Sequence, residues 1–244
     1  KEVNMIKISH VEYINTLPYK VALEKSDFIR QNSIISKRHP AGCAYDLMNG
    51  NADIGLVPVG ALHLLTDFKI IHGFGLASKK KVNSVLLVSN VPIDSISKVY
   101  LDYQSKSSNG FVKILAEKFW NLNYLYQNAE ENFLDLIEGD TAAVVIGDRA
   151  LNIRNSVKFK YDIAEEWFKF TGKPALFAVW IANNKVDENF IAEFNKVLKF
   201  GVENRKQIAH NNKHLYKNFD LIDYLTNCMD YYYDENKQES LKLF

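Results

Sequence analysis

The sequence predicts an α/β fold of two doubly wound lobes with a central cleft between them. Three observations lead to this prediction. Strand-like and helix-like segments alternate along the 244 residues, one block of such segments occurs twice about ninety residues apart, and two apolar segments connect the copies. Alternation of this kind is typical of parallel β-α-β units. Ligands bind such lobes where strand C-termini and helix N-termini converge, so we expect the functional site in the cleft.

The first copy begins with a strand at residues 6–10 and a helix from Leu17. A second strand, a short helix and a glycine-led strand complete it, at residues 34–38, 41–49 and 50–58. Gly50 ends the helix, is followed by a polar residue and leads into a short buried strand.

The second copy repeats this order. A strand at residues 98–102 precedes a helix at 109–120, and further segments follow at 123–126 (strand), 130–138 (helix) and 139–147 (buried strand). Gly139 stands where Gly50 stands in the first copy.

Two apolar strands are predicted to cross between the lobes, at residues 84–89 and 175–182. The predicted lobes are therefore 1–89 plus 183–244 and 90–182, and a hinge on two short strands permits closure around a ligand. From residue 187 onward apolar residues recur at helical steps, and further helices are expected at 215–229 and 236–244. The aromatic run 231–233 is interpreted as packing beneath these helices.

The composition excludes several classes of partner. A formal net charge of +1 provides no bulk field for nucleic acid or an anionic membrane. No segment approaches the length of a membrane span, and the N-terminus lacks an apolar signal region, so we expect a cytoplasmic protein.

Cys43 and Cys228 are far apart and are expected to be reduced thiols. Neither a nucleotide-binding loop nor metal-ligand spacing is evident, so we expect no cofactor and no metal, while the oligomeric state stays open.

Candidate binding residues cluster at the starts of helices. Ser107 and Ser108 precede an amphipathic helix, whose first amides and positive dipole end attract carboxylate or phosphate; plain N-capping is the alternative. Ala41 and Gly42 stand at an analogous start in the first lobe, where small residues leave backbone amides approachable. Asn15 lies between a strand and a helix, and its amide can both donate to and accept from a substrate, or cap the helix.

Among the carboxylates, Asp102 and Asp148 are the most plausible near the cleft. Asp148 follows Gly147 at the end of a strand, where it can either reach the cleft or cap the next turn. These residues alone support a cytoplasmic binder of a small anion and say little about catalysis.

Several motifs in order resemble the menaquinone-biosynthesis MqnA/MqnD family along nearly the whole chain, at residues 11–18, 50–58, 84–89, 146–148 and 167–180. The segment 171–180 is similar to the MqnA branch, chorismate dehydratase. The resemblance implies a type II periplasmic-binding-protein-like fold. It also implies a hydro-lyase activity that converts chorismate to 3-[(1-carboxyvinyl)oxy]benzoate and water in the futalosine pathway. Two departures are visible: Ala41 stands where a serine is common, and Lys173 where an apolar residue is usual.

With this resemblance, Asn15 and Ser84 are expected to be catalytic. Asn15 is assigned to the departing hydroxyl or the enolpyruvyl group, and Ser84 to a carboxylate. Substrate contacts are expected from Ser107, Ser108, Ala41, Gly42, Pro58, Gly147 and Asp148. The general base is not evident: His10 is near in sequence but is interpreted as part of a strand end, and a substrate carboxylate is the alternative base.

Two other functions stay open. A cytoplasmic sensor module would bind a carboxylate without turnover. The MqnD branch, which acts on a larger substrate, would need a histidine base in the second lobe. Residues 91–182 contain no histidine, which tells against this branch.

Overall fold

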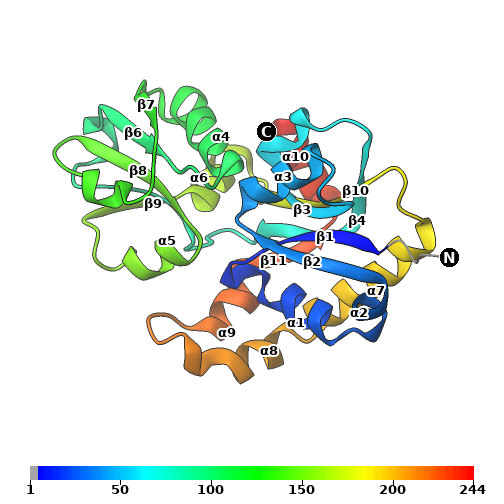
Figure 1. The fold of residues 1–244 in the computed structure, drawn as a ribbon. Coiled ribbons are helices and arrows are strands. Elements are labelled where there is room, and N and C mark those ends of the chain that lie inside the picture. Colours follow the sequence, from blue (N-terminus) through cyan, green and yellow to red (C-terminus); the bar gives the residue numbers. More distant parts are fainter. Residues whose placement is uncertain (1–4) are drawn as a thin grey trace.

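The computed structural model describes residues 5–244 and consists of two lobes side by side, each built on its own β-sheet (Figure 1). Lobe 1 carries both ends of the described chain. Its six-stranded sheet has the order β11-β4-β10-β3-β1-β2, with the bounds β1 (Ile6–Val11), β2 (Ser33–Arg38), β3 (Ile54–Pro58), β4 (Phe68–Ser78), β10 (Leu176–Asn183) and β11 (Met229–Tyr233). β1 runs parallel to β2 and β3, whereas β10 pairs antiparallel with both β3 and β4.

Helices cover both faces of this sheet, and every residue of β3 is therefore buried. One face carries α3 (Pro40–Met48) and α10 (Glu235–Leu243), and the other carries α1 (Leu17–Lys25), α7 (Glu188–Glu203) and α8 (Arg205–Asn212) (Figure 1). The remaining helical segments of the lobe are short: the 3-10 helices η1 (Ile14–Thr16), η2 (Val59–Leu64) and η6 (Lys213–Leu215), the helices α2 (Asp27–Asn32) and α9 (Leu221–Asp223), and the π-helical turn η7 (Tyr224–Cys228).

Lobe 2 is smaller and has the strand order β7-β6-β8-β5-β9. Its strands are β5 (Val85–Ser89), β6 (Lys98–Leu101), β7 (Leu125–Asn128), β8 (Thr141–Ile146) and β9 (Phe159–Asp162). Its helices are α4 (Lys106–Leu115), continued by a π-helical turn η4 (Ala116–Trp120), α5 (Gly147–Ile153) and α6 (Ile163–Thr171), with short 3-10 turns η3 (Ile93–Ser95) and η5 (Phe133–Leu136). The predicted α/β fold of two lobes is thus confirmed.

The structure corrects the predicted crossing strands. β5 pairs with β8 and β9 and so belongs to lobe 2, whereas β10 pairs with β3 and β4 and belongs to lobe 1. Buried backbone groups need hydrogen-bond partners, and each of these two strands finds them within a single sheet. The chain therefore crosses in the irregular segments 79–84 and 172–175. Their ends at lobe 1 lie side by side, where the Ser78 amide donates to the Ala175 carbonyl at 2.9 Å.

Three predicted segments also differ. The predicted helix at 130–138 contains only η5, the predicted helix at 215–229 is broken into η6, α9 and η7, and residues 231–233 form the edge strand β11. In β11 the side chains of Tyr231 and Tyr233 are buried while that of Tyr232 is exposed, the alternation that a strand produces. Among residues 5–244, no helix combines the length and apolar character needed to cross a membrane.

Candidate functional site

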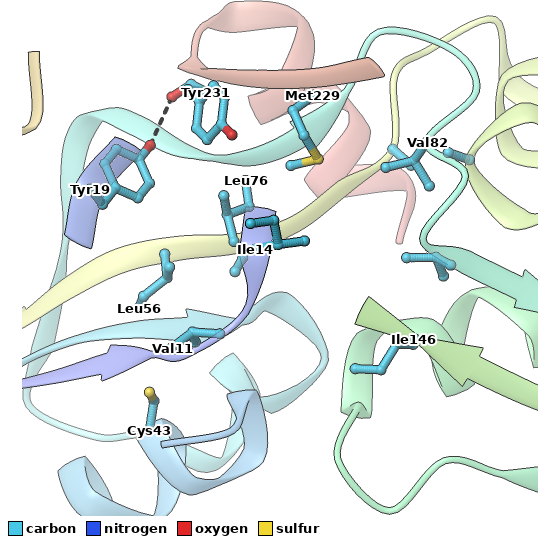
Figure 2. Close-up of a cluster of buried hydrophobic side chains, with 14 of the residues drawn as sticks. Val11, Ile14, Tyr19, Cys43, Leu56, Leu76, Val82, Ile146, Met229 and Tyr231 are labelled. Atoms are coloured by element: carbon cyan, nitrogen blue, oxygen red, sulfur yellow. Dashed lines mark hydrogen bonds between the residues drawn. The ribbon is translucent and has the colours of Figure 1, made fainter. Parts of the chain in front are cut away.

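A cavity lies between the lobes. Its walls are mainly apolar and come from both sheets and from the crossing segments (Figure 2). Figure 2 shows Ile146, at the end of β8 in lobe 2, across from Val11 and Leu76 of lobe 1. The remaining apolar lining residues are Pro40, Pro58, Val82, Val85, Phe177, Ala178 and Met229. A flat, mostly hydrocarbon ring fits such walls, and the polar lining residues then determine its orientation.

Six of the nine predicted site residues line this cavity: Asn15, Pro58, Ser84, Ser107, Ser108 and Gly147. The other three, Ala41, Gly42 and Asp148, lie outside the lining.

Asn15 lies in η1, and its backbone carbonyl accepts a hydrogen bond of 2.8 Å from the Tyr231 hydroxyl. Its side-chain Oδ1 is buried and has no hydrogen-bond partner among the described residues. Buried polar atoms in native proteins are nearly always paired, so this amide oxygen at the cavity wall is free to accept a hydrogen bond.

Ser84 precedes β5 and is 1% exposed. Its Oγ accepts a hydrogen bond of 2.7 Å from the Tyr224 hydroxyl, and its carbonyl accepts one of 2.8 Å from the Gly147 amide. The residue therefore connects the C-terminal part of lobe 1 to the start of α5 in lobe 2.

The start of α4 brings a third serine to the cavity. Ser105 is the N-cap: its Oγ accepts from the Ser108 amide at 3.1 Å and donates to the Ser108 Oγ at 2.8 Å. Ser107 is used differently, because its Oγ donates to the Phe177 carbonyl at 2.7 Å and accepts from the Gly60 amide at 3.2 Å, both in lobe 1. Ser108 thus keeps a proton to donate, whereas the proton of Ser107 is committed to the contact between lobes.

Gly147 has a φ of 62°, and a Cβ there would lie 3.1 Å from the ring of Tyr13. The Tyr13 hydroxyl donates to Oε1 of Gln104 in lobe 2. Next to it, Asp148 turns away from the cavity and accepts from the Ile14 amide at 3.1 Å. Burial raises the pKa of Asp148, although this hydrogen bond opposes the shift.

At the start of α3 the backbone amides already have partners. The Ala41 amide donates to the Gln104 carbonyl at 3.3 Å, and the Gly42 amide donates to the His39 carbonyl at 2.9 Å. Only Pro40 of this turn lines the cavity. The sequence correctly indicates a helix start near the cleft but does not show that the opposite lobe covers it.

Two titratable groups near the cleft have structural partners. Asp102 is fully buried and pairs with Arg149 at 2.7 Å; burial raises the pKa of this carboxyl, and the guanidinium opposes the shift. His10 is buried in β1, where desolvation lowers its pKa to about 3, so it is neutral at pH 7. Neither side chain lines the cavity.

Sequence reasoning missed Tyr13, Ser105 and Tyr224. Tyr13 lies within the motif at residues 11–18, and Ser105 belongs to the same serine cluster as Ser107, so both could have been found. Tyr224 gave no sequence signal, because it reaches Ser84 only through the folding of the C-terminal segment.

The comparisons with known proteins agree with this architecture. A protein of Archaeoglobus fulgidus, AF1704, has a TM-score of 0.76 at 12% identity, with 99% of this chain and 96% of that chain covered. The Candida albicans CA3427 gene product, described as having the generic periplasmic binding protein fold, has a TM-score of 0.61 at 11% identity, with 98% and 89% covered. The periplasmic aliphatic sulphonate binding protein SsuA of Escherichia coli has a TM-score of 0.54 at 16% identity, with 91% and 78% covered. These likenesses show a periplasmic-binding-protein-like fold.

A family model described as menaquinone biosynthesis matches residues 6–244. This match spans both lobes, the cavity between them and every motif on which the sequence resemblance depends. The chain belongs to the menaquinone-biosynthesis family, the MqnA family.

Proposed function

We propose that this protein is a chorismate dehydratase, a hydro-lyase that converts chorismate to 3-[(1-carboxyvinyl)oxy]benzoate and water. One observation carries the proposal beyond family membership. The cavity between the lobes places the unpaired amide oxygen of Asn15 together with hydroxyl groups of Ser84 and Ser108 on otherwise apolar walls. This combination suits a ring that carries carboxylates and one departing hydroxyl.

The polar groups suggest an orientation for the substrate. One carboxylate lies at the start of α4, where the helix dipole favours negative charge. The hydroxyl groups of Ser108 and Ser84 donate hydrogen bonds to carboxylate oxygens. The ring packs between apolar side chains such as Leu76 and Phe177, and the hydroxyl that leaves lies at Asn15.

The reaction removes the proton from the ether-bearing ring carbon and hydroxide from the neighbouring carbon, and the two leave as water. Deprotonation moves charge onto the ring carboxylate, where donors held in place stabilise it; one such donor contributes about 3–4 kcal/mol in comparable sites. Loss of hydroxide then makes the ring aromatic, so the chemistry needs placement more than strong catalytic groups.

The substrate provides the base in this proposal. The titratable side chain in the lining is that of Tyr13, and burial raises its pKa, so the phenol stays protonated at neutral pH. We therefore assign proton removal to the enolpyruvyl carboxylate of chorismate, which the cavity holds next to the ring.

The competing function is a carboxylate-binding module without turnover. Its support is the fold, since the similar SsuA protein is described as an aliphatic sulphonate binding protein, and sulphonate is also an anion. The two functions differ in one measurable outcome, the fate of the ligand after binding.

The test is conversion of chorismate by the purified protein without added metal or nucleotide. We expect chromatography with ultraviolet detection to show loss of chorismate and growth of the aromatic enolpyruvyl ether. Asn15→Ala should lower kcat by about a hundredfold and change KM less, because the amide acts on the leaving hydroxyl. Asn90→Ala is a matched control, since Asn90 is an exposed amide outside the cavity. If chorismate disappears no faster than it decays spontaneously, the result favours a carboxylate-binding module without turnover.

A further inference from the structure

The side chain of Tyr224 reaches the cavity indirectly, through Ser84. Tyr224 begins the π-helical turn η7 near the C-terminus and is 2% exposed. Its hydroxyl lies 2.7 Å from the Ser84 Oγ, and Ser84 in turn lines the cavity. Tyr224 itself does not line the cavity, so it has no direct access to a ligand there.

The direction of this hydrogen bond follows from the surroundings of the two groups. Among the described residues, the Tyr224 hydroxyl has no other hydrogen-bond partner, so its proton must go to the Ser84 Oγ or remain buried without an acceptor. A buried donor without an acceptor is strongly unfavourable, because it loses its hydrogen bonds to water and gains none in the protein. Burial also raises the pKa of Tyr224, which keeps the phenol protonated and able to donate. Ser84 is therefore the acceptor, and its own proton is left to point elsewhere.

The Ser84 proton has no acceptor within residues 5–244. The only side-chain hydrogen bond of Ser84 among the described residues is the one that its Oγ accepts from Tyr224. Because Ser84 lines the cavity, its proton is free to point toward a ligand there.

We propose that Tyr224 is a positioning residue for the reaction: it holds the Ser84 hydroxyl so that the Ser84 proton is donated to a substrate carboxylate in the cleft. This inference rests on the proposed function for the identity of the substrate. It predicts a two-step chain of donors, from Tyr224 to Ser84 and from Ser84 to the ligand, in which each bond polarises the next.

A double-mutant cycle tests the proposal. Tyr224→Phe, Ser84→Ala and the combined variant are compared with the wild type in chorismate turnover and in the dissociation constant of 3-[(1-carboxyvinyl)oxy]benzoate. We expect Tyr224→Phe to raise KM and the dissociation constant by about tenfold with a smaller change in kcat. In the Ser84→Ala background the same change should have no further effect, because Tyr224 acts through the Ser84 hydroxyl.

Tyr124→Phe is the matched control, since the Tyr124 hydroxyl is also a buried phenol but donates to the Ile93 carbonyl at 3.0 Å, away from the cavity. It should leave both constants unchanged. A merely structural role for Tyr224 would lower the melting temperature and would raise KM equally in both backgrounds. That additive result would overturn the proposal.

A second measurement avoids dependence on the folding of Tyr224→Phe. In protein labelled with ¹³Cζ-tyrosine, the product should shift the Tyr224 resonance in the wild type and leave it in place in Ser84→Ala. An unshifted wild-type resonance under saturating product would contradict the chain of donors. Binding without turnover in the wild type would disprove the dehydratase activity. The double-mutant cycle could then still test the role of Tyr224 through the dissociation constants. Absence of binding would overturn both.

Discussion

At the scale of single residues, the hydroxyl groups in the cleft differ in what their protons can still do. Ser107 and Ser108 are adjacent and similarly buried, and the sequence assigns them the same role. In the structure the Ser107 proton goes to the Phe177 carbonyl, whereas the Ser108 Oγ accepts from Ser105 and keeps its own proton. One serine therefore joins the lobes and the other is available to a ligand.

This difference predicts opposite phenotypes for two neighbouring substitutions. Ser107→Ala removes two hydrogen bonds between lobes and should lower the free energy of unfolding by about 1–3 kcal/mol. Ser108→Ala should instead raise KM by about tenfold with a smaller loss of stability, because it removes the donor that we propose for the substrate carboxylate. Denaturant unfolding and chorismate kinetics on both variants check this. Equal effects of the two changes on KM would show that both hydroxyls contact the substrate.

Asp148 predicts a pH dependence. Its carboxyl is held against η1 by the Ile14 amide, and burial raises its pKa above the ordinary value of 3.8. The folded state therefore binds a proton more tightly than the unfolded state. The resulting contribution to stability is fully present below pH 3.8 and is lost as the pH rises through the folded-state pKa.

Asp148→Asn keeps an acceptor for the Ile14 amide but cannot ionise. The free energy of unfolding of the variant, relative to the wild type, should therefore increase from about pH 4 to about pH 7. Denaturant titrations of both proteins at several pH values measure this difference. Asp53→Asn, at a carboxylate remote from the cavity, is the comparison variant. A difference for Asp148→Asn that does not change with pH would mean that the carboxyl titrates alike in the folded and unfolded states.

At the scale of elements, the start of α4 in lobe 2 lies in close backbone contact with η2 of lobe 1. A Cβ on Gly60, in η2 of lobe 1, would lie 2.7 Å from the carbonyl carbon of Lys106 and 2.8 Å from its oxygen. The first residue of α4 therefore approaches η2 as closely as a residue without a side chain allows. The sequence contains Gly60 but provides no indication that a helix of the other lobe covers it.

Gly60→Ala should push the start of α4 away from η2, because backbone atoms cannot move aside as a flexible side chain can. We expect overpacking of this kind to lower the free energy of unfolding by about 1–3 kcal/mol and to raise KM, since α4 carries the serines of the cavity. Gly42→Ala is the control: its new Cβ would meet only the Arg38 side chain, at 3.2 Å. Thermal unfolding and kinetics measure both variants, and matching results for the two would refute the close-contact argument.

The sequence predicted β1, β2, β5, β6, β7, β8 and β10 within two residues. It did not predict β4, β9 or β11 as strands, and it did not show which sheet β5 and β10 join. Alternation and apolar runs are local signals, and β5 and β10 are apolar whichever sheet contains them. The sheet that β5 joins depends on its pairing with β8 and β9, and the sheet that β10 joins depends on its pairing with β3 and β4. These partners are distant in sequence.

The candidate site also depends on contacts between segments that are distant in sequence. Asn15 and Ser84 were selected from sequence motifs. By contrast, the hydrogen-bond acceptors that occupy the Ser107 hydroxyl and the Ala41 amide lie in the opposite lobe, and the sequence does not show them.

At the scale of the whole molecule, the lobes contact each other through hydrogen bonds and through aromatic packing. Gln104 of lobe 2 accepts from the Tyr13 hydroxyl and the Ala41 amide, both in lobe 1. The C-terminal helix α10 packs on lobe 2, where Phe244 lies 4.6 Å from Phe111 between ring centroids. Aromatic packing of this kind tolerates small rotations, whereas hydrogen bonds across a cleft break when it opens.

The contacts of Gln104 and Ser107 should therefore control the closed state. A net hydrogen bond contributes about 1 kcal/mol, so removing several shifts the equilibrium toward open lobes by a factor of ten or more. We expect Gln104→Ala combined with Ser107→Ala to increase the radius of gyration of the free protein in small-angle scattering. Saturating 3-[(1-carboxyvinyl)oxy]benzoate should return it to the wild-type value, because in the proposed function the ligand bridges Asn15 in lobe 1 and Ser108 in lobe 2.

The matched control is Gln127→Ala combined with Ser95→Ala, a pair of exposed residues of lobe 2 outside the cavity lining. Its radius should equal that of the wild type with and without ligand. If the Gln104 and Ser107 variant also keeps the wild-type radius, the closed arrangement is held by the packing of α10 against α4 and α6. In that case Phe244→Ala, which removes the ring beside Phe111, should produce the expansion instead, and the mobile boundary of the cleft would lie on the side of the C-terminal helix.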